Sequence, residues 1–461
     1  MKRSNIVFAG LMASAIAGCG GSGGGSGAVT PSNPVAPVTP VPTVSLSIDS
    51  PKVTVGKSAK LTWSSTNATS CTASGAWAGP QATSGTSAQV SSTPGPLSYT
   101  LTCTGAGGAA NQSVSLAVAI PVQKTSYANA KQGGLDRIEL PKEVDTAQAY
   151  ARADFKGDGT ISLFTAKIMY KLETSTAATA EPSVFAFWRK SANGSWVKED
   201  SMIDNTVGCV HPRKAAVADF NNDGKPDVLV ACTGYDGGDY AGEKMFIVMS
   251  NPSGVYHSAS LQNLLGYFHG AAAADLDGDG NIDFVAVDPN SSKALRMFMN
   301  KGDGTFIEAS DKFPTYVHNR DFYTIELLDV NGDNKLDMLV GGHDWQDDSK
   351  AAYVQGNGTA NFNTALVTVL PTVPDQGVVL DFLVANGSIY VDRTSGGGTA
   401  GFYQSKVIQK IDIVSMRSSV PFIELLSTSE PGEWYPWFPW LLQTSAGIQS
   451  DNAHLATAAV E

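Results

Sequence analysis

The sequence predicts an all-β protein in which a small β-sandwich is followed by a β-propeller of six or seven blades. Short runs of alternating apolar and polar residues, separated by Gly, Ser, Thr and Pro, fill residues 43–120 and are typical of strands. Farther along the 461-residue chain, an acidic loop between two apolar runs recurs about every 55 residues, a period typical of propellers and solenoids. Long amphipathic helical patterns are hard to find, which also favours an all-β fold.

Residues 1–19 have the features of an export signal. Lys2 and Arg3 precede a short apolar core, which ends in the small residues of IAGC at 16–19. The core is too short to span a bilayer. The segment resembles a bacterial lipoprotein signal peptide, which implies that Cys19 is acylated; a plain secretory peptide with a stray cysteine is the alternative. Because Gly20 follows, and not the aspartate of an inner-membrane retention signal, we expect a lipid-anchored outer-membrane protein, periplasmic or exposed at the cell surface.

Residues 20–42 are rich first in Gly and Ser and then in Pro, which predicts a flexible linker that holds the rest of the chain off the membrane. The formal net charge is −12, with 31 basic residues and no basic cluster beyond Lys2 and Arg3. A phosphate backbone needs a cationic face, so nucleic acid is excluded as a partner. Contact with the membrane is expected through the lipid anchor only.

Four cysteines remain once Cys19 is assigned to lipid, and outside the cytoplasm they are expected to form disulfides. Three connectivities are possible. The pairs Cys71–Cys103 and Cys209–Cys232 keep each bridge within one domain, and we expect this arrangement.

Residues 43–120 are expected to form a sandwich of seven or so strands. Leu61 and Trp63 alternate with polar residues, as do Tyr99 and Cys103, so each strand should have one buried face. The segment resembles the immunoglobulin-like domains of bacterial surface proteins. Trp63 precedes the first cysteine, unlike the antibody pattern, so the resemblance supports the architecture only. A spacer role is expected; a binding role of its own is the alternative.

The repeated loop has the spacing of a calcium site. In the best copy, DLDGDGNID at residues 275–283, side-chain oxygens occupy positions 1, 3, 5 and 9, position 7 offers a main-chain carbonyl, and glycine at position 6 permits a sharp turn. An EF-hand would need glutamate at position 12, where Ala286 stands, and helical flanks. The predicted ligands in the three good copies are Asp219, Asn221, Asp223, Lys225 and Asp227; Asp275, Asp277, Asp279, Asn281 and Asp283; and Asp329, Asn331, Asp333, Lys335 and Asp337.

Two further copies depart from this pattern. The one that starts at Asp154 has Lys156 at position 3, where an ammonium opposes a cation, so we expect that site to be empty. The one at Asp381 is eroded. In the third good copy Asn334 replaces the glycine. About three structural calcium ions are expected, and hydrated turns without metal are the alternative.

Each unit continues with an apolar strand and a hairpin that contains Gly and an aromatic residue, as in LRMFMNKGDGTF at 295–306. The loop and the hairpin together are similar to the FG-GAP/VCBS repeat family, to which integrin alpha-like propellers belong. The resemblance covers residues 122–461 and implies a β-propeller with calcium in its blade loops.

The end of the propeller opposite the calcium loops is the expected ligand face. There, segments before the first strands and after the second strands of the blades converge near the axis, and their aromatic and polar residues could stack on a sugar and bind its hydroxyls. The predicted ligand-binding residues are His211, Arg213, Tyr235, Asp236, Asp239, Tyr240, His269, Arg320, Asp321, His343, Asp344 and Trp345. Ordinary solvated turns are the alternative. A second aromatic segment, EWYPWFPWLL at 433–442, is expected to cover the closure of the propeller or to pack on the sandwich, or else to bind a polymer or a partner.

No catalytic motif stands out. The leading hypothesis is a surface lipoprotein whose calcium-stabilised propeller serves in binding or adhesion to a glycan or a surface or extracellular protein. A polysaccharide lyase or hydrolase on the same scaffold is the first alternative, with His211, Arg213 and His269 as its candidate residues. A passive scaffold in an envelope complex is the second.

Overall fold

The computed structural model describes residues 39–122, 125–126, 141, 143, 149–171, 174–399, 401–425, 440–444, 447–451 and 459–460. The signal segment, Cys19, most of the linker and most of the aromatic segment at 433–442 lie outside these residues. The described regular structure is β-strand, apart from two short 3₁₀ helices, η3 (Asp200–Met202) and η4 (Thr315–Val317). None of the helices in the described part of the chain has the length and apolar character needed to cross a membrane.

The N-terminal domain is a sandwich of two sheets. Trp63 and Tyr99 lie in its core, where Leu61 and Leu101 are fully buried. One sheet has the order β1 (Thr43–Ile48), β3 (Ser58–Thr66), β6 (Ser84–Val90), and the other β2 (Lys52–Thr54), β8 (Gly108–Ala119), β7 (Gly95–Gly105), β4 (Ser70–Gly75), β5 (Gly79–Gln81).

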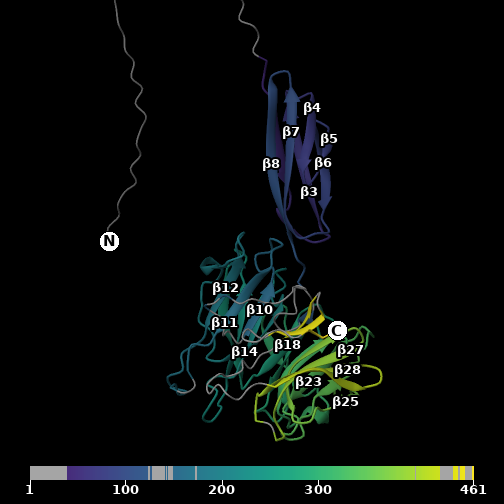
Figure 1. Ribbon diagram of the computed structural model, residues 1–461. Coiled ribbons are helices and arrows are strands. Elements are labelled where there is room, and N and C mark those ends of the chain that lie inside the picture. The colour runs from purple at the N-terminus through teal and green to yellow at the C-terminus, as the bar shows by residue number, and fades with distance from the viewer. Residues whose placement is uncertain are drawn as a thin grey trace, which may run out of the picture.

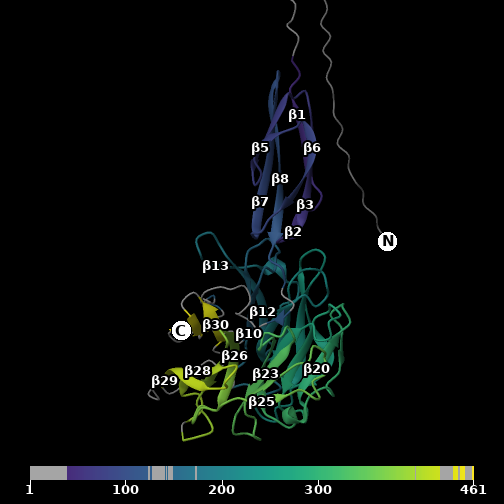
Figure 2. The same cartoon turned by 90° about the vertical axis from the view of Figure 1, so that its right-hand side faces the viewer.

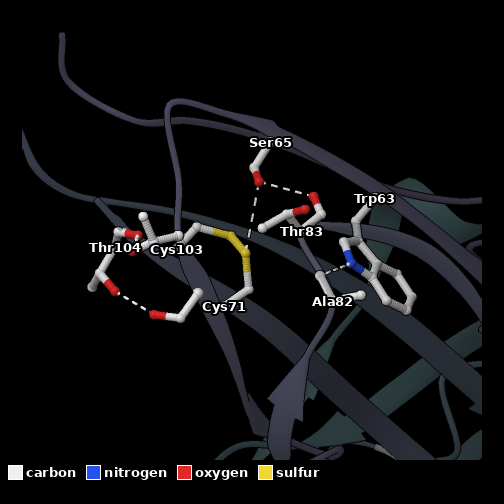
Figure 3. Close-up of a disulfide and its surroundings, with 9 residues drawn as sticks. Trp63, Ser65, Cys71, Ala82, Thr83, Cys103 and Thr104 are labelled. Atoms are coloured by element: carbon white, nitrogen blue, oxygen red, sulfur yellow. Dashed lines mark hydrogen bonds between the residues drawn. A yellow bond between two sulfur atoms is a disulfide. The ribbon is translucent and has the colours of Figure 1, made fainter. Parts of the chain in front are cut away.

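The predicted disulfide Cys71–Cys103 is present in this domain (Figure 3). Its cysteines are register partners on β4 and β7, so it joins neighbouring strands of one sheet. In antibody domains the bridge joins the two sheets, and this difference separates the domain from the antibody pattern. Trp63 packs nearby, with its indole Nε1 donating to the Ala82 carbonyl at 2.9 Å.

Beyond the sandwich, consecutive segments of the chain form a series of antiparallel sheets, here called blades one to five, and a final three-stranded sheet. Their strands are, in order, β10 (Ala149–Ala153), β11 (Ser162–Lys167), β12 (Val184–Lys190), β13 (Trp196–Lys198); β14 (Pro212–Ala218), β15 (Asp227–Cys232), β16 (Glu243–Ser250), β17 (Tyr256–Gly266); β18 (Gly270–Ala274), β19 (Asp283–Asp288), β20 (Ala294–Asn300), β21 (Phe306–Glu308); β22 (Phe322–Leu328), β23 (Asp337–Gly342), β24 (Ala352–Val354), β25 (Val367–Val369); β26 (Val378–Ala385), β27 (Ser388–Thr394), β28 (Ser405–Asp412), β29 (Ser418–Leu425); and β30 (Trp440–Thr444), β31 (Gly447–Asp451), β32 (Ala459–Val460).

The first strands of the blades pack against one another around a common axis. Contacts run from β10 to β14, β18, β22, β26 and β30 in turn, and Figure 2 shows β30 beside β26. Small side chains suit this crowded centre: the four alanines of β18, residues 271–274, are at most 1 % exposed. The arrangement is that of a propeller, in which each sheet radiates outward from its first strand.

Two segments lack the arrangement of strand, acidic loop and strand that starts the other blades. The short strand β9 (Thr125–Ser126) does not begin a blade of its own but pairs with β18 and contacts β14 and β22, so it lies at the axis. Asp381 lies inside β26, not at the start of a loop. The strands β26 and β27 are joined directly at Asn386 and Gly387, whose φ angles of 49° and 70° are those of a tight hairpin turn.

The sandwich stands above the propeller in Figure 1 and contacts the first acidic loop, where Lys52 Nζ donates to the Lys156 carbonyl. The chain enters the sandwich at its far tip, where Asn67 Nδ2 donates to the Val41 carbonyl, and leaves it next to the first loop, where the Ile120 amide donates to Asp154 Oδ2 at 3.0 Å. The opposite end of the propeller therefore lies away from residues 39–42, where the chain enters the sandwich.

Candidate functional site

The three acidic loops share one hydrogen-bonding pattern. The carboxylate at position 1 accepts backbone amides from inside its own loop; for Asp275 these are Gly278 and Gly280, at 2.8 and 3.0 Å. Position 6 has a positive φ in each loop, 92° at Gly280 and 63° at Asn334. Asparagine tolerates this left-handed conformation better than most residues, which explains how Asn334 replaces glycine.

The carboxylate at position 9 is buried and ties the loop to the blade. Asp283 accepts the amide of Leu276 at 3.0 Å and that of Asn300, at the end of the third strand, at 2.8 Å. Asp227 and Asp337 make the corresponding pairs of bonds. Each loop is thus held between the first two strands and the third strand of its blade.

The loop of blade three can hold a metal ion. Carboxylate oxygens of Asp275, Asp277 and Asp283 lie within 4.8 Å of one another. Burial raises the pKa of Asp283 to about 7, against the hydrogen bonds from Asn300 and Leu276, and the charges of Asp277 and Asp279 raise it further. A cation at this point would stabilise the ionised carboxylates, so the residues present fit a metal that prefers oxygen ligands.

The loops of blades two and three are also linked to each other. Asn222 Nδ2 donates to Asn281 Oδ1 at 2.7 Å and to the Gly302 carbonyl at 3.2 Å. At position 7, the side chain of Lys225 turns away to the Asn251 carbonyl, so that its own carbonyl remains the group it can offer an ion.

At the opposite end of the propeller, aromatic rings form a continuous chain across blades two to five. Adjacent ring centroids are 4.5 to 5.7 Å apart. The imidazole of His343 stacks on Trp345 with an interplanar angle of 6°, and Phe402 meets Trp345 edge-on. The chain runs through Tyr240, Tyr267, His269, Tyr323, His343 and Phe402. We call these residues with Trp345 the aromatic belt.

A polar cluster lies beside the belt. Arg213 Nη2 donates to Asp236 Oδ2 at 2.5 Å, and the Tyr267 hydroxyl donates to the other oxygen of that carboxylate. Tyr170 forms a 2.6 Å hydrogen bond with His211 Nδ1, and its ring packs at a tilt against Tyr235, with centroids 5.4 Å apart. Four of the predicted ligand residues (His211, Arg213, Tyr235 and Asp236) therefore meet here.

A small cavity opens between the belt and the axis. Its water-accessible space is about 30 Å³, room for roughly two water molecules, so it could admit a substituent of a ligand but not a whole sugar. Both cations in its lining are in ion pairs, Arg213 with Asp236 and the buried Lys214 with Glu326 at 3.1 Å. The lining residues are Arg213, Lys214, His269, Tyr323, Thr324, His343, Val378, Val379, Leu380 and Tyr403.

The histidines of this end are held neutral. Burial lowers the pKa of His343 to about 4, and burial together with the nearby Arg213 places the pKa values of His211 and His269 well below the usual range. Burial raises the pKa of Tyr170 to about 12. The cavity is therefore lined by neutral rings and by balanced ion pairs.

The neutral state of these histidines predicts that the stability of the protein depends on pH. An unfolded histidine titrates near pH 6.5, so between pH 6.5 and about 4 the unfolded chain binds a proton that folded His343 refuses. The free energy of unfolding should fall as the pH falls through that window, by up to about 3 kcal/mol from this residue. With calcium saturating, urea titrations of His343→Gln should show a shallower fall than wild type. His257→Gln, whose side chain is 59 % exposed, is the matched control, and an equal slope in wild type and His343→Gln would refute the assignment.

The remaining predicted ligand residues have other surroundings. Asp344 forms an ion pair with the buried Arg393 at 2.7 Å. Arg320 donates to the carbonyls of Tyr316 and Asp347, and the amide of Asp321 donates to Ser349 Oγ, so both hold the loop that carries Trp345. Tyr240 packs on Tyr267 as part of the belt, and Asp239 is exposed.

Sequence reasoning missed five aromatic residues at this end: Tyr170, Tyr267, Tyr323, Phe402 and Tyr403. Alignment of the repeats on their loops could have found three of them. Tyr267 stands as far before Asp275 as His211 before Asp219, and Tyr323 stands as far before Asp329 as His269 before Asp275. Tyr170 follows the end of β11 at the same interval at which Tyr235 follows β15 and Trp345 follows β23. Phe402 and Tyr403 offered no such signal.

Known proteins support the repeat assignment. Residues 211–243 match the FG-GAP repeat and residues 275–340 the FG-GAP-like repeat. No curated protein matches the chain. Among solved structures, a quinonprotein alcohol dehydrogenase-like protein from Bacteroides thetaiotaomicron is similar with 15 % identity and a TM-score of 0.34, over 88 % of this chain and 78 % of that one. A candidate phosphatase from the same organism is similar with 9 % identity and a TM-score of 0.33, over 82 % and 84 %. Residues 211–243 and 275–340 are thus similar to FG-GAP repeats.

Proposed function

We propose that this protein is a lipid-anchored surface module that binds a neutral glycan through the aromatic belt. The observation on which the proposal rests is the belt itself, an unbroken series of rings that ends in the exposed side chains of Tyr240 and Phe402, 46 % and 53 % accessible. Aromatic faces of this kind stack on the apolar faces of sugar rings, and nearby hydroxyl and amide groups bind the sugar hydroxyls.

The charges around the cavity favour a neutral ligand. Arg213 and Lys214 are both paired with carboxylates, and the three histidines are neutral. An acidic sugar would have to compete with Asp236 for Arg213, so its carboxylate would gain little. The same balance favours binding over acid–base catalysis by His211, Arg213 and His269.

The position of the belt also supports this function. The belt lies at the end of the blades opposite the acidic loops, the first of which contacts the sandwich, and the chain enters the sandwich at its far tip near Val41. If Cys19 is the lipid anchor in the outer membrane, the belt points away from the bilayer, where a ligand outside the membrane can reach it.

We propose that the ions held by the acidic loops are calcium. Their donors are carboxylate, amide and carbonyl oxygens, which calcium prefers and softer metals do not. The loops lie far from the belt along the same first strands, so the ions would stabilise the blades and take no direct part in ligand binding.

Trp345→Ala tests the binding face. The full-length protein in detergent micelles, loaded with calcium, should bind neutral glycans on an array, and the variant should lose at least tenfold in affinity, since loss of a central aromatic anchor costs about 2 kcal/mol or more. Trp196→Ala, on the outer strand β13 of blade one, is the control and should bind as the wild type does.

Other outcomes would change the assignment. Binding of acidic glycans only would contradict the neutral ligand. A blank array from folded, calcium-loaded protein would refute the glycan and direct the search to protein partners. Release of a shortened glycan, lost in His269→Ala, would establish the enzyme instead.

A further inference from the structure

The first acidic loop, residues 154–162, differs from the other three in what surrounds it. Lys156 at position 3 points away from the loop and forms an ion pair with Glu199 at 2.5 Å. Ser162 stands at position 9, where the other loops have a buried aspartate. With two of the four side-chain ligand positions lost, these residues do not fit a calcium ion.

A cation from the sandwich domain reaches this loop. Lys52, on β2, extends its ammonium to the carbonyl of Lys156 at 2.6 Å. A Cβ added to Gly157 would lie only 2.1 Å from Lys52 Nζ, so the ammonium lies directly against the loop backbone. Burial and the neighbouring Lys225 lower the pKa of Lys52, while the charges of Asp154, Asp158 and Asp223 raise it.

The backbone of the first loop makes close contacts with the sandwich. Asp154 Oδ2 accepts the amide of Ile120, the residue after β8, at 3.0 Å, as well as that of Gly159 at 2.8 Å. Its other oxygen accepts the amide of Asp158 at 2.9 Å. At Gly159 a Cβ would lie 2.0 Å from the backbone nitrogen of Gly95, so only glycine permits this approach of β7.

We propose that the first loop is a metal-free docking site for the sandwich, in which the Lys52 ammonium, bonded to the Lys156 carbonyl, supplies positive charge in place of a bound ion. The loop keeps the carboxylates at positions 1 and 5, and Lys52 balances their charge from outside the propeller. The sandwich is thereby coupled to the propeller in an orientation that does not depend on calcium.

Hydrogen–deuterium exchange on the full-length protein tests this proposal. In wild type, the amides of Ile120, Asp158 and Gly159 should remain protected when a chelator removes calcium, while the amides inside the loops at 219–227, 275–283 and 329–337 should lose protection. Lys52→Met removes the charge and keeps the length of the side chain. It should speed exchange at Ile120, Asp158 and Gly159 about fivefold, the size expected for loss of one exposed ionic contact.

Lys60→Met is the matched control, because Lys60 is an exposed lysine of the same domain, on β3. It should leave these amides unchanged, and the exchange of β18 amides should show that both variants are folded. Two results would overturn the proposal: unchanged protection in Lys52→Met, or loss of protection of the first loop with chelator in parallel with the other loops. Neither result bears on glycan binding, so this proposal and the proposed function fail separately.

Discussion

Removal of calcium is expected to lower the melting temperature of the propeller by roughly 10 °C or more, the largest effect we predict. A ligand present at a hundred times its dissociation constant stabilises the folded state by about 2.7 kcal/mol, and three loops have the predicted ligand pattern. In a domain of this size, each kcal/mol shifts the melting temperature by about 2 °C. Calorimetry of the full-length protein with calcium and with chelator measures the shift.

The physical reason lies in the buried carboxylates. Burial raises the pKa values of Asp227 and Asp283 to about 8 and about 7, because their charges are poorly compensated by the backbone amides alone. A divalent cation compensates them and holds the first two strands of the blade together. Without it, neighbouring carboxylates such as Asp277 and Asp279 repel one another.

Asp277→Asn is the specific variant for this prediction. It removes one charge from the cluster in blade three and should abolish about one third of the calcium-dependent shift. Asp303→Asn changes a fully exposed aspartate of the nearby hairpin at 301–305 and should leave the shift intact. Equal melting temperatures with calcium and with chelator would show that the loops are hydrated turns.

Asp344→Ala is expected to destabilise the protein by about 3 to 5 kcal/mol, the cost of leaving a buried charge without its partner. The guanidinium of Arg393 is fully buried and pairs with Asp344 Oδ2 at 2.7 Å. Arg393 also donates to Gln409 Oε1 at 2.7 Å and to the Gln376 carbonyl at 3.2 Å, so it has no route to solvent. Loss of the carboxylate leaves this cation in a low-dielectric site.

The same variant should weaken ligand binding, because Asp344 lies between His343 and Trp345. Its oxygen Oδ1 accepts the amide of Ala351 at 3.2 Å and so closes the loop on which these rings are displayed. Asp239→Ala, in the corresponding loop of blade two, removes an exposed carboxylate and should change stability by less than about 0.5 kcal/mol. Urea titration of both variants measures their free energies of unfolding. If Asp344→Ala lost as little stability as Asp239→Ala, Arg393 would have found another partner.

Several features of the structure could be predicted from short stretches of the sequence. The alternation around Leu61 and Trp63 predicted strands with one buried face. The disulfides Cys71–Cys103 and Cys209–Cys232 are the two expected from the rule that each bridge stays within one domain. The spacing of Asp275, Asp277 and Asp283 brought their oxygens together, since all three lie in one nine-residue loop. The strands and the loop depend on residues close together in the chain, and the disulfides follow from the pairing of four cysteines.

Features that depend on contacts between blades could not be predicted in this way. Asp344 was a plausible ligand residue beside Trp345, but blade five places Arg393 against it. Phe402, from the connection between β27 and β28, completes the belt because blades four and five meet at the axis end. Asp381 was expected to start an eroded copy of the loop, yet it lies inside a strand because blade five turns directly at Asn386 and Gly387.

By itself the sequence determined the strands, the acidic loops and the two disulfides, because backbone alternation and ligand spacing act within a few residues. Only the tertiary structure decided which side chains meet at the axis and what the degenerate first loop is used for. The Lys52 ammonium and the Lys156 carbonyl come from different domains, 104 residues apart. Contacts of that kind arise from the packing of whole sheets and domains, which no local pattern specifies.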